Sequence, residues 1–168
     1  MTERFGIVAC SKSKRGENEP DREFAARDLY DSWLFDGRVA AVEAHCDEWA
    51  IMSAEHGYVA PDERLTWYDR RIDELPPERR AELAREVVEA IPDGVDEVLV
   101  LMGRDYFDPL SEALPDSMSV WDPLKGVRLF EQRSELRDLA DATEQADLVT
   151  DGGREQHSAG TDRRCDNA

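Results

Sequence analysis

Two lysines lie close together after the first apolar run of the sequence, in the stretch Cys10-Ser11-Lys12-Ser13-Lys14. The whole chain holds only three lysines against eighteen arginines and 39 carboxylates, and the third lysine is Lys125. Serine hydroxyls, backbone N–H groups and two ammonium groups near the start of a helix suit the binding of phosphate. The stretch is therefore a candidate anion site, and a solvated loop after a strand is the alternative. The phosphate-binding motifs GxxxxGK[ST] and GxGxxG are both absent.

A second polar group surrounds His56 in the stretch Ser53-Ala54-Glu55-His56-Gly57. Histidine exchanges protons near neutral pH, so His56 is a candidate general acid or base and Ser53 a candidate hydrogen-bond donor. A turn residue satisfied by its neighbours is the structural alternative. Cys10 is by default a small buried apolar residue, and it becomes a candidate nucleophile if the lysines and His56 lie close to it.

Tyrosines follow both polar stretches, and their rings are candidates for stacking on a base. Half-buried packing is the alternative for each of them. The candidate catalytic residues are His56, Cys10 and Ser53. The candidate substrate-binding residues are Ser11, Lys12, Lys14, Tyr30, Ser32, Gly57, Tyr68, Asp69, Gly103, Tyr106 and Lys125.

Apolar runs alternate with helical patterns along the chain. Buried strands are predicted over 4–10, 48–54, 96–103 and 117–124. Helices are predicted over 21–46 with a break at Gly37, and over 76–91, 104–114 and 126–142, with a loop over 55–69. This alternation predicts a Rossmann-like three-layer α/β fold: a mainly parallel sheet of about four strands with helices on both faces. We expect one domain over 1–142 and a disordered acidic tail over 143–168.

The candidate residues follow the predicted strands at the points where those strands end. The carboxyl ends of parallel strands lie at one edge of a sheet, and ligands bind there, where the order of connection reverses. Every lysine and His56 fall in segments that leave this edge. We therefore expect the four segments to converge on one binding site.

Composition limits the classes of protein that fit. A net charge of −18 with pI near 4.5, and lysine almost replaced by arginine, indicates the cytoplasm of a salt-accumulating halophile. An acidic protein that binds basic partners is the alternative, and neither excludes a phosphate-bearing substrate. Three cysteines without a CxxC pair predict no disulfide framework and a reducing compartment. We expect no membrane span, no metal and no cofactor, and composition does not indicate the oligomeric state.

The stretches 10–14, 26–32 and 49–57, with Pro61-Asp62 and Tyr68-Asp69, resemble the family catalogued as domain of unknown function 6884. Gly103 with Tyr106, and 123–126, continue the resemblance over most of the chain before the tail. More distantly, the serine–glycine loop with its proline and following tyrosine resembles the DNA-binding peroxide-stress proteins. It also resembles a domain of the enzymes that modify tRNA with archaeosine. Those kinships imply a fold related to uracil-DNA glycosylases.

Two functions of different class fit these observations. In the first, the chain is an enzyme that acts on a nucleotide or nucleic acid at a base or N-glycosidic bond. His56 is then the general acid or base, and the lysines bind phosphate. Alternatively, it is a binding module without turnover, whose affinity rests on the lysines with Arg15, Arg70 and Arg71 and falls with salt. A redox role for Cys10 is a third, weaker hypothesis.

Overall fold

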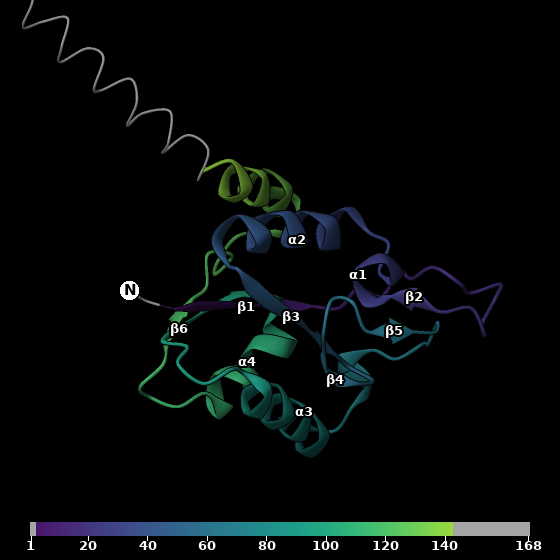
Figure 1. Ribbon diagram of the computed structural model, residues 1–168, viewed down its shortest axis with the longest axis horizontal. Coiled ribbons are helices and arrows are strands. Elements are labelled where there is room, and N and C mark those ends of the chain that lie inside the picture. The colour runs from purple at the N-terminus through teal and green to yellow at the C-terminus, as the bar shows by residue number, and fades with distance from the viewer. Residues whose placement is uncertain (1–2, 143–168) are drawn as a thin grey trace, which may run out of the picture.

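The computed structural model describes residues 3–142, and this part of the chain forms a five-stranded sheet with the order β4-β3-β1-β6-β7 (Figure 1). The central strand β1 pairs in parallel with β3 on one side and β6 on the other, and β6 pairs in parallel with β7. Strand β4 is antiparallel to β3. The bounds are β1 Arg4–Ala9, β3 Glu48–Ser53, β4 Gly57–Val59, β6 Glu97–Leu101 and β7 Ser119–Trp121.

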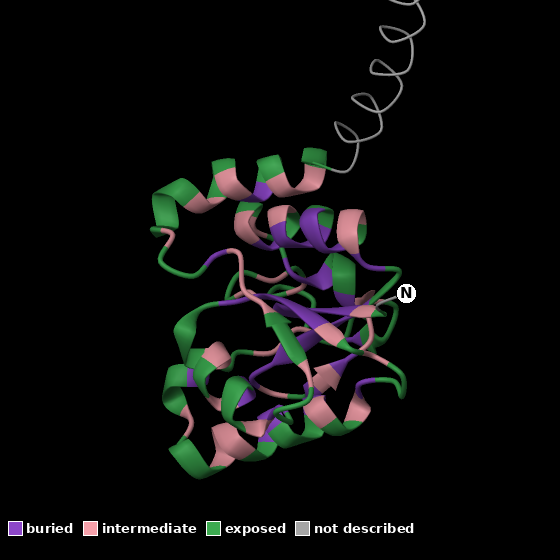
Figure 2. Cartoon of the chain, turned by 90° about the vertical axis from the view of Figure 1, so that its left-hand side faces the viewer, coloured by how far each residue is buried: buried purple, intermediate pink, exposed green. Residues whose placement is uncertain are grey.

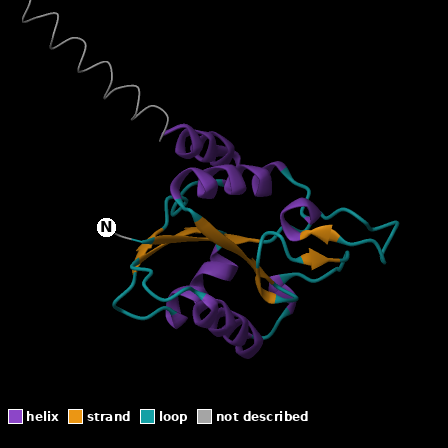
Figure 3. Cartoon of the chain, in the orientation of Figure 1, coloured by secondary structure: helices purple, strands orange, loops and turns teal. Residues whose placement is uncertain are grey.

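Helices cover both faces of the sheet, which confirms the three-layer α/β fold (Figure 3). Helix α2 (Trp33–His45) lies on one face, and a helix over residues 129–142 packs outside it. Helices α3 (Pro77–Ala90) and α4 (Arg104–Ala113) lie on the other face. Side chains of β1 alternate between the layers, because Val8 packs on the α2 side and Ile7 on the α3 side. Figure 2 shows the strands as the buried centre of this arrangement.

A small structure lies beyond the carboxyl end of the sheet. Strands β2 (Phe24–Ala25) and β5 (Arg64–Leu65) form an antiparallel pair next to the short helix α1 (Ala26–Leu29). The 3₁₀ turn η1 spans Ile72–Glu74. Strand β2 and helix α1 belong to the segment after β1, whereas β5 and η1 belong to the segment after β4. The pairing of β2 with β5 therefore joins these two segments.

Two expectations about elements are wrong. Helix α2 runs through Gly37 without a break, because the missing side chain makes room for Leu136, whose Cδ1 would lie 3.2 Å from a Cβ there. The predicted loop over 55–69 contains the strands β4 and β5, and β4 adds an antiparallel strand to the four that were expected in the main sheet. Strand β4 has only three residues and is stabilised by its pairing with β3, which local sequence patterns do not report.

The strand order places a switch point beside the central strand. From β1 the chain passes to β3 on one side, and after β4 it crosses over to β6 on the other side. The connections leaving β1 and β6 therefore diverge, and a crevice forms between the carboxyl ends of these two strands. Cys10 follows β1 at this crevice, and Tyr106 lies in the first turn of α4 after β6.

The expected disordered tail over 143–168 lies outside the described residues. Between residues 3 and 142, no helix is long and apolar enough to cross a bilayer.

Candidate functional site at the carboxyl edge of the sheet

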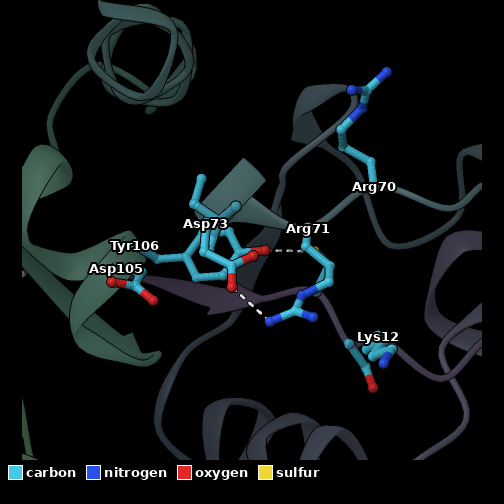
Figure 4. A pocket seen from close by; sticks show the side chains of 9 residues that line it. Lys12, Arg70, Arg71, Asp73, Asp105 and Tyr106 are labelled. Atoms are coloured by element: carbon cyan, nitrogen blue, oxygen red, sulfur yellow. Dashed lines mark hydrogen bonds and ion pairs between the residues drawn. The ribbon is translucent and has the colours of Figure 1, made fainter. Parts of the chain in front are cut away.

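A cavity of about 200 Å³ opens at the switch point between β1 and β6. Its walls come from the loop after β1, the segment around η1 and the start of α4 (Figure 4). The lining residues are Cys10, Ser11, Lys12, Arg70, Arg71, Ile72, Asp73, Asp105 and Tyr106. The segments after β1 and β6 thus meet at one site.

Cys10 lies at the wall of the cavity and is 8% exposed. Its Sγ atom lies 3.1 Å from the hydroxyl oxygen of Tyr106, within hydrogen-bond reach. Burial raises the pKa of Tyr106, so its phenol is neutral at physiological pH and has a proton to donate. A thiol and a phenol thus contact each other at the wall of the cavity.

A chain of three hydroxyl groups runs behind the cavity. Ser53 Oγ accepts the backbone N–H groups of Glu55 at 3.2 Å and His56 at 3.1 Å, so its own proton is left to donate to the Tyr68 hydroxyl at 2.8 Å. Tyr68 then donates to the Tyr30 hydroxyl at 2.7 Å. Burial raises the pKa of both tyrosines, so the chain holds its protons at neutral pH. These bonds fix the orientation of the tyrosines.

Lys14 packs against the same tyrosines. Its Nζ atom lies 4.3 Å from the centre of the Tyr68 ring and 5.9 Å from that of Tyr30, and it donates a hydrogen bond to the Lys12 carbonyl at 3.2 Å. Burial lowers the pKa of Lys14, and the charges of Cys10 and Asp69 oppose that shift. The ammonium is therefore held by aromatic faces and not by an ion pair.

Two serines join the β1 loop to helix α2. Ser32 Oγ accepts the backbone N–H of Phe35 at 3.1 Å and caps the helix, and it also accepts the hydroxyl of Ser11 at 3.0 Å. The start of α2 and the loop that carries Cys10 are thereby held together.

The remaining predicted site residues do not line the cavity. His56 is exposed, and its ring contacts that of Tyr68 edge-on at 5.0 Å. Gly57, at φ +71°, makes the turn into β4, and Gly103 begins α4. Asp69 is exposed beside Lys14, and Lys125 is exposed in the loop after β7.

Three residues that line the cavity were missed in the sequence, namely Ile72, Asp73 and Asp105. Asp73 pairs with Arg71 at the cavity wall, and Asp105 follows Gly103 at the start of α4. Arg38 is 7% exposed inside the fold, although arginine is seldom buried. The sequence could have indicated that Arg38 is buried, because it shares one i, i+3, i+4, i+7 stripe of a helix with Phe35, Val39 and Val42. Over residues 3–142, no three His, Cys, Asp or Glu side chains gather to hold a metal ion.

Comparisons with known proteins give a family but no activity. Residues 6–138 match the family described as "Family of unknown function (DUF6884)". The chain is also 28% identical over 129 residues to the uncharacterized protein YfjM of Bacillus subtilis (strain 168), covering 74% of this chain and 86% of that protein. No solved structure matches the chain. The expected kinship with peroxide-stress proteins, archaeosine enzymes and uracil-DNA glycosylases finds no support in these comparisons.

Proposed function

We propose that this chain, which belongs to the DUF6884 family, is an enzyme that acts on a nucleotide or nucleic acid at a base or N-glycosidic bond. The observation that carries the proposal is the position of Cys10, which lines a small cavity at the switch point and whose Sγ atom lies 3.1 Å from the Tyr106 hydroxyl. A nucleophile and a proton donor that meet where open α/β sheets bind ligands favour catalysis over binding alone.

The size and charge of the cavity support a nucleotide as the substrate. Drug-sized ligand sites enclose roughly 300–1,000 Å³, so a cavity of about 200 Å³ accepts a base or a phosphate and leaves the rest of a nucleotide outside. Lys12 is exposed at the wall, where its ammonium can reach a phosphate, and the ring of Tyr106 offers a face to a base.

Each predicted catalytic residue has a role in this proposal. At an N-glycosidic bond, Cys10 Sγ attacks the sugar carbon and a C–S bond forms as the bond to the base breaks. Tyr106 donates its proton to the departing base and takes the proton of the thiol, and water then hydrolyses the C–S bond and releases the sugar. Ser53 acts at a distance, by holding Tyr68 through their 2.8 Å hydrogen bond. His56 is exposed beside Tyr68, where its ring can contact a substrate that extends beyond the cavity.

The test measures turnover of a panel of nucleosides, nucleotides and single-stranded oligonucleotides in molar KCl, by chromatography of the products. Cys10→Ser should reduce turnover at least about 100-fold while binding persists. Cys46→Ser is the matched control, because Cys46 is also 8% exposed and ends α2 outside the cavity, where burial raises its pKa to about 11. It should keep full activity.

A His56→Ala variant separates the two candidate catalytic groups. If His56→Ala loses turnover and Cys10→Ser keeps it, the acid–base residue and not the thiol performs the chemistry. If the wild-type chain binds a panel member and turns over none, the chain is a binding module. In that case Lys12→Ala should weaken binding, and the affinity should fall steeply with KCl.

A further inference from the structure

Large apolar side chains are exposed at the starts of two neighbouring helices. Trp33 is the first residue of α2 and is 44% exposed, whereas Leu129 and Phe130 begin the helix over 129–142 and are 61% and 74% exposed. Of the four large apolar side chains exposed between residues 3 and 142, the fourth is Val120 on strand β7. Single exposed apolar residues are ordinary, but a group of them indicates a surface that binds a partner.

Contacts along the two helices place these starts side by side (Figure 1). The Arg133 guanidinium lies 5.8 Å from the centre of the Trp33 ring, and one turn further along both helices Leu136 lies against Gly37. The two helices therefore run in the same direction. Phe130 precedes Arg133 by three residues, so both lie on one face of their helix. The Trp33 and Phe130 side chains thus belong to one surface.

Three cations surround these apolar side chains. Lys125 and Arg128 lie just before the helix over 129–142, and Arg133 lies in its second turn. All three are exposed, and none forms an ion pair with a residue between 3 and 142. Residues 123–133 hold three cations and one carboxylate, although carboxylates outnumber cations 39 to 21 in the whole chain. The aromatic–basic surface consists of Trp33, Lys125, Arg128, Leu129, Phe130 and Arg133.

This surface begins at the edge of the sheet where the cavity opens. Strands β1 and β7 point in the same direction, and the segments that lead to the two helices leave their carboxyl ends. Ser32, the residue before Trp33, accepts the hydroxyl of Ser11 at 3.0 Å, and Ser11 lines the cavity. Asp122, in the loop after β7, pairs with Arg104 at 2.6 Å in the first turn of α4, and that turn also lines the cavity. A long ligand can therefore extend from the cavity onto the aromatic–basic surface.

We propose that the aromatic–basic surface binds single-stranded nucleic acid, with bases stacked on Trp33 and Phe130 and phosphates on the three cations. A single strand offers the faces of its bases together with a row of phosphates, which matches aromatic side chains interleaved with cations. A second copy of this chain would bring a net charge of −18, so charge complementarity favours nucleic acid over self-association. The continuation into the cavity rests on the proposed function, whereas the binding surface does not.

Fluorescence anisotropy of labelled strands measures this binding without any turnover. The probes are single strands of DNA and RNA of about 12 nucleotides, the DNA strand without its bases, and the DNA duplex. Each is titrated with the full chain at low and at molar KCl. Salt weakens the contacts between cations and phosphates, whereas stacking needs no charge. At molar KCl we therefore expect the intact single strands to bind at least about fivefold more tightly than the abasic strand or the duplex.

Phe130 is the residue to change first, because its exposed ring can be replaced without disturbing the core. Phe130→Leu keeps the apolar bulk but not the ring, and it should weaken binding of the intact strand at least about fivefold. Phe130→Trp keeps a ring and should bind as the wild-type chain does. Val120→Ala is the matched control, since Val120 is also exposed but lies on β7 outside the aromatic–basic surface, and it should leave binding unchanged.

A second pair of variants tests the cations. Arg128→Ala should weaken binding at low KCl and make the affinity less dependent on salt, because one phosphate contact is lost. Arg85→Ala removes the same charge from the exposed surface of α3, which covers the other face of the sheet, and it should change neither quantity. Equal effects of the two variants would mean that only the net charge matters, and the inference would then be wrong.

The remaining outcomes separate this inference from the proposed function. If the abasic strand binds as well as the intact strand, or Phe130→Leu binds as well as the wild-type chain, no base stacks on this surface and the inference is wrong. It is equally wrong if no strand binds, or if sedimentation shows a dimer that Phe130→Leu dissociates. If strands bind through Phe130 and Arg128 but nothing is turned over, the surface stands and the enzymatic function fails. If nucleosides are turned over and no strand binds, only the proposed function stands.

Discussion

Cys10 is the residue on which the polar groups of the site converge. Five titratable side chains lie near it, and they come from the β1 loop, the segment after α1, helix α2, the loop after β5 and helix α4. They are Lys14, Tyr30, Arg38, Tyr68 and Tyr106. Lys14 and Arg38 are cations, and the Tyr106 hydroxyl lies within hydrogen-bond reach of the Cys10 Sγ atom at 3.1 Å.

The orientation of these groups depends on Tyr68, and its hydroxyl can be tested alone. Tyr68→Phe leaves the hydroxyls of Ser53 and Tyr30 without their partner in a buried region. We expect the free energy of unfolding to fall by about 1–3 kcal/mol, measured by urea denaturation at fixed KCl. Tyr58→Phe is the control, because the Tyr58 hydroxyl makes no hydrogen bond within residues 3–142. Equal losses in both variants would contradict the hydroxyl chain.

At the scale of elements, the sequence predicted the features that depend on residues close together in the chain. The apolar runs around Val8, Ile51 and Val100 are strands in the structure. Four segments were expected to converge on one site; those after β1 and β6 line one cavity, and those after β3 and β7 do not line it. Strand β4 was missed because its pairing with β3 comes from tertiary structure. The expected break at Gly37 is absent, and the role of this glycine also depends on tertiary structure. Leu136, about a hundred residues away in the sequence, packs where a side chain at position 37 would lie. The roles assigned to His56 and Lys125 stay predictions.

Helix α2 carries Ser32 and Arg38, so its distance from β1 determines the geometry of the site. Gly6 sets that distance, because a Cβ at this position would lie 1.9 Å from Val42 Cγ2. Gly6→Ala must push α2 away from the sheet, and we expect it to lower the free energy of unfolding by about 1–3 kcal/mol or more. Urea denaturation at fixed KCl measures this loss.

Two further variants make that prediction specific. Gly103→Ala is the control, because no atom lies within 4 Å of a Cβ there, and it should cost less than about 1 kcal/mol. The double variant Gly6→Ala/Val42→Ala removes the clashing methyl groups and should recover part of the stability. If Val42→Ala restores nothing, the contact between α2 and β1 is not what Gly6 protects.

At the scale of the whole molecule, the 39 aspartates and glutamates outnumber the 21 lysines and arginines. Across residues 3–142 the ion pairs all involve arginine, and most of them are at least one-third exposed on both sides. Each exposed pair contributes only about 0–1 kcal/mol. The uncompensated negative charge is therefore the dominant electrostatic effect, and it opposes the compact state.

Salt should stabilise this chain, because screening relieves repulsion spread over the whole surface while it weakens only marginal ion pairs. The Debye length falls from about 30 Å at 0.01 M salt to about 3 Å at 1 M. We expect the urea midpoint to rise steeply between 0.01 and 0.5 M KCl and then to level off, because the repulsion is screened by then. An equal osmolality of sucrose should not reproduce that steep region, since it stabilises by exclusion from the surface and not by screening. A midpoint that is constant up to 0.5 M KCl would show that the net charge does not limit stability, and the interpretation of the composition as an adaptation to salt would then fail.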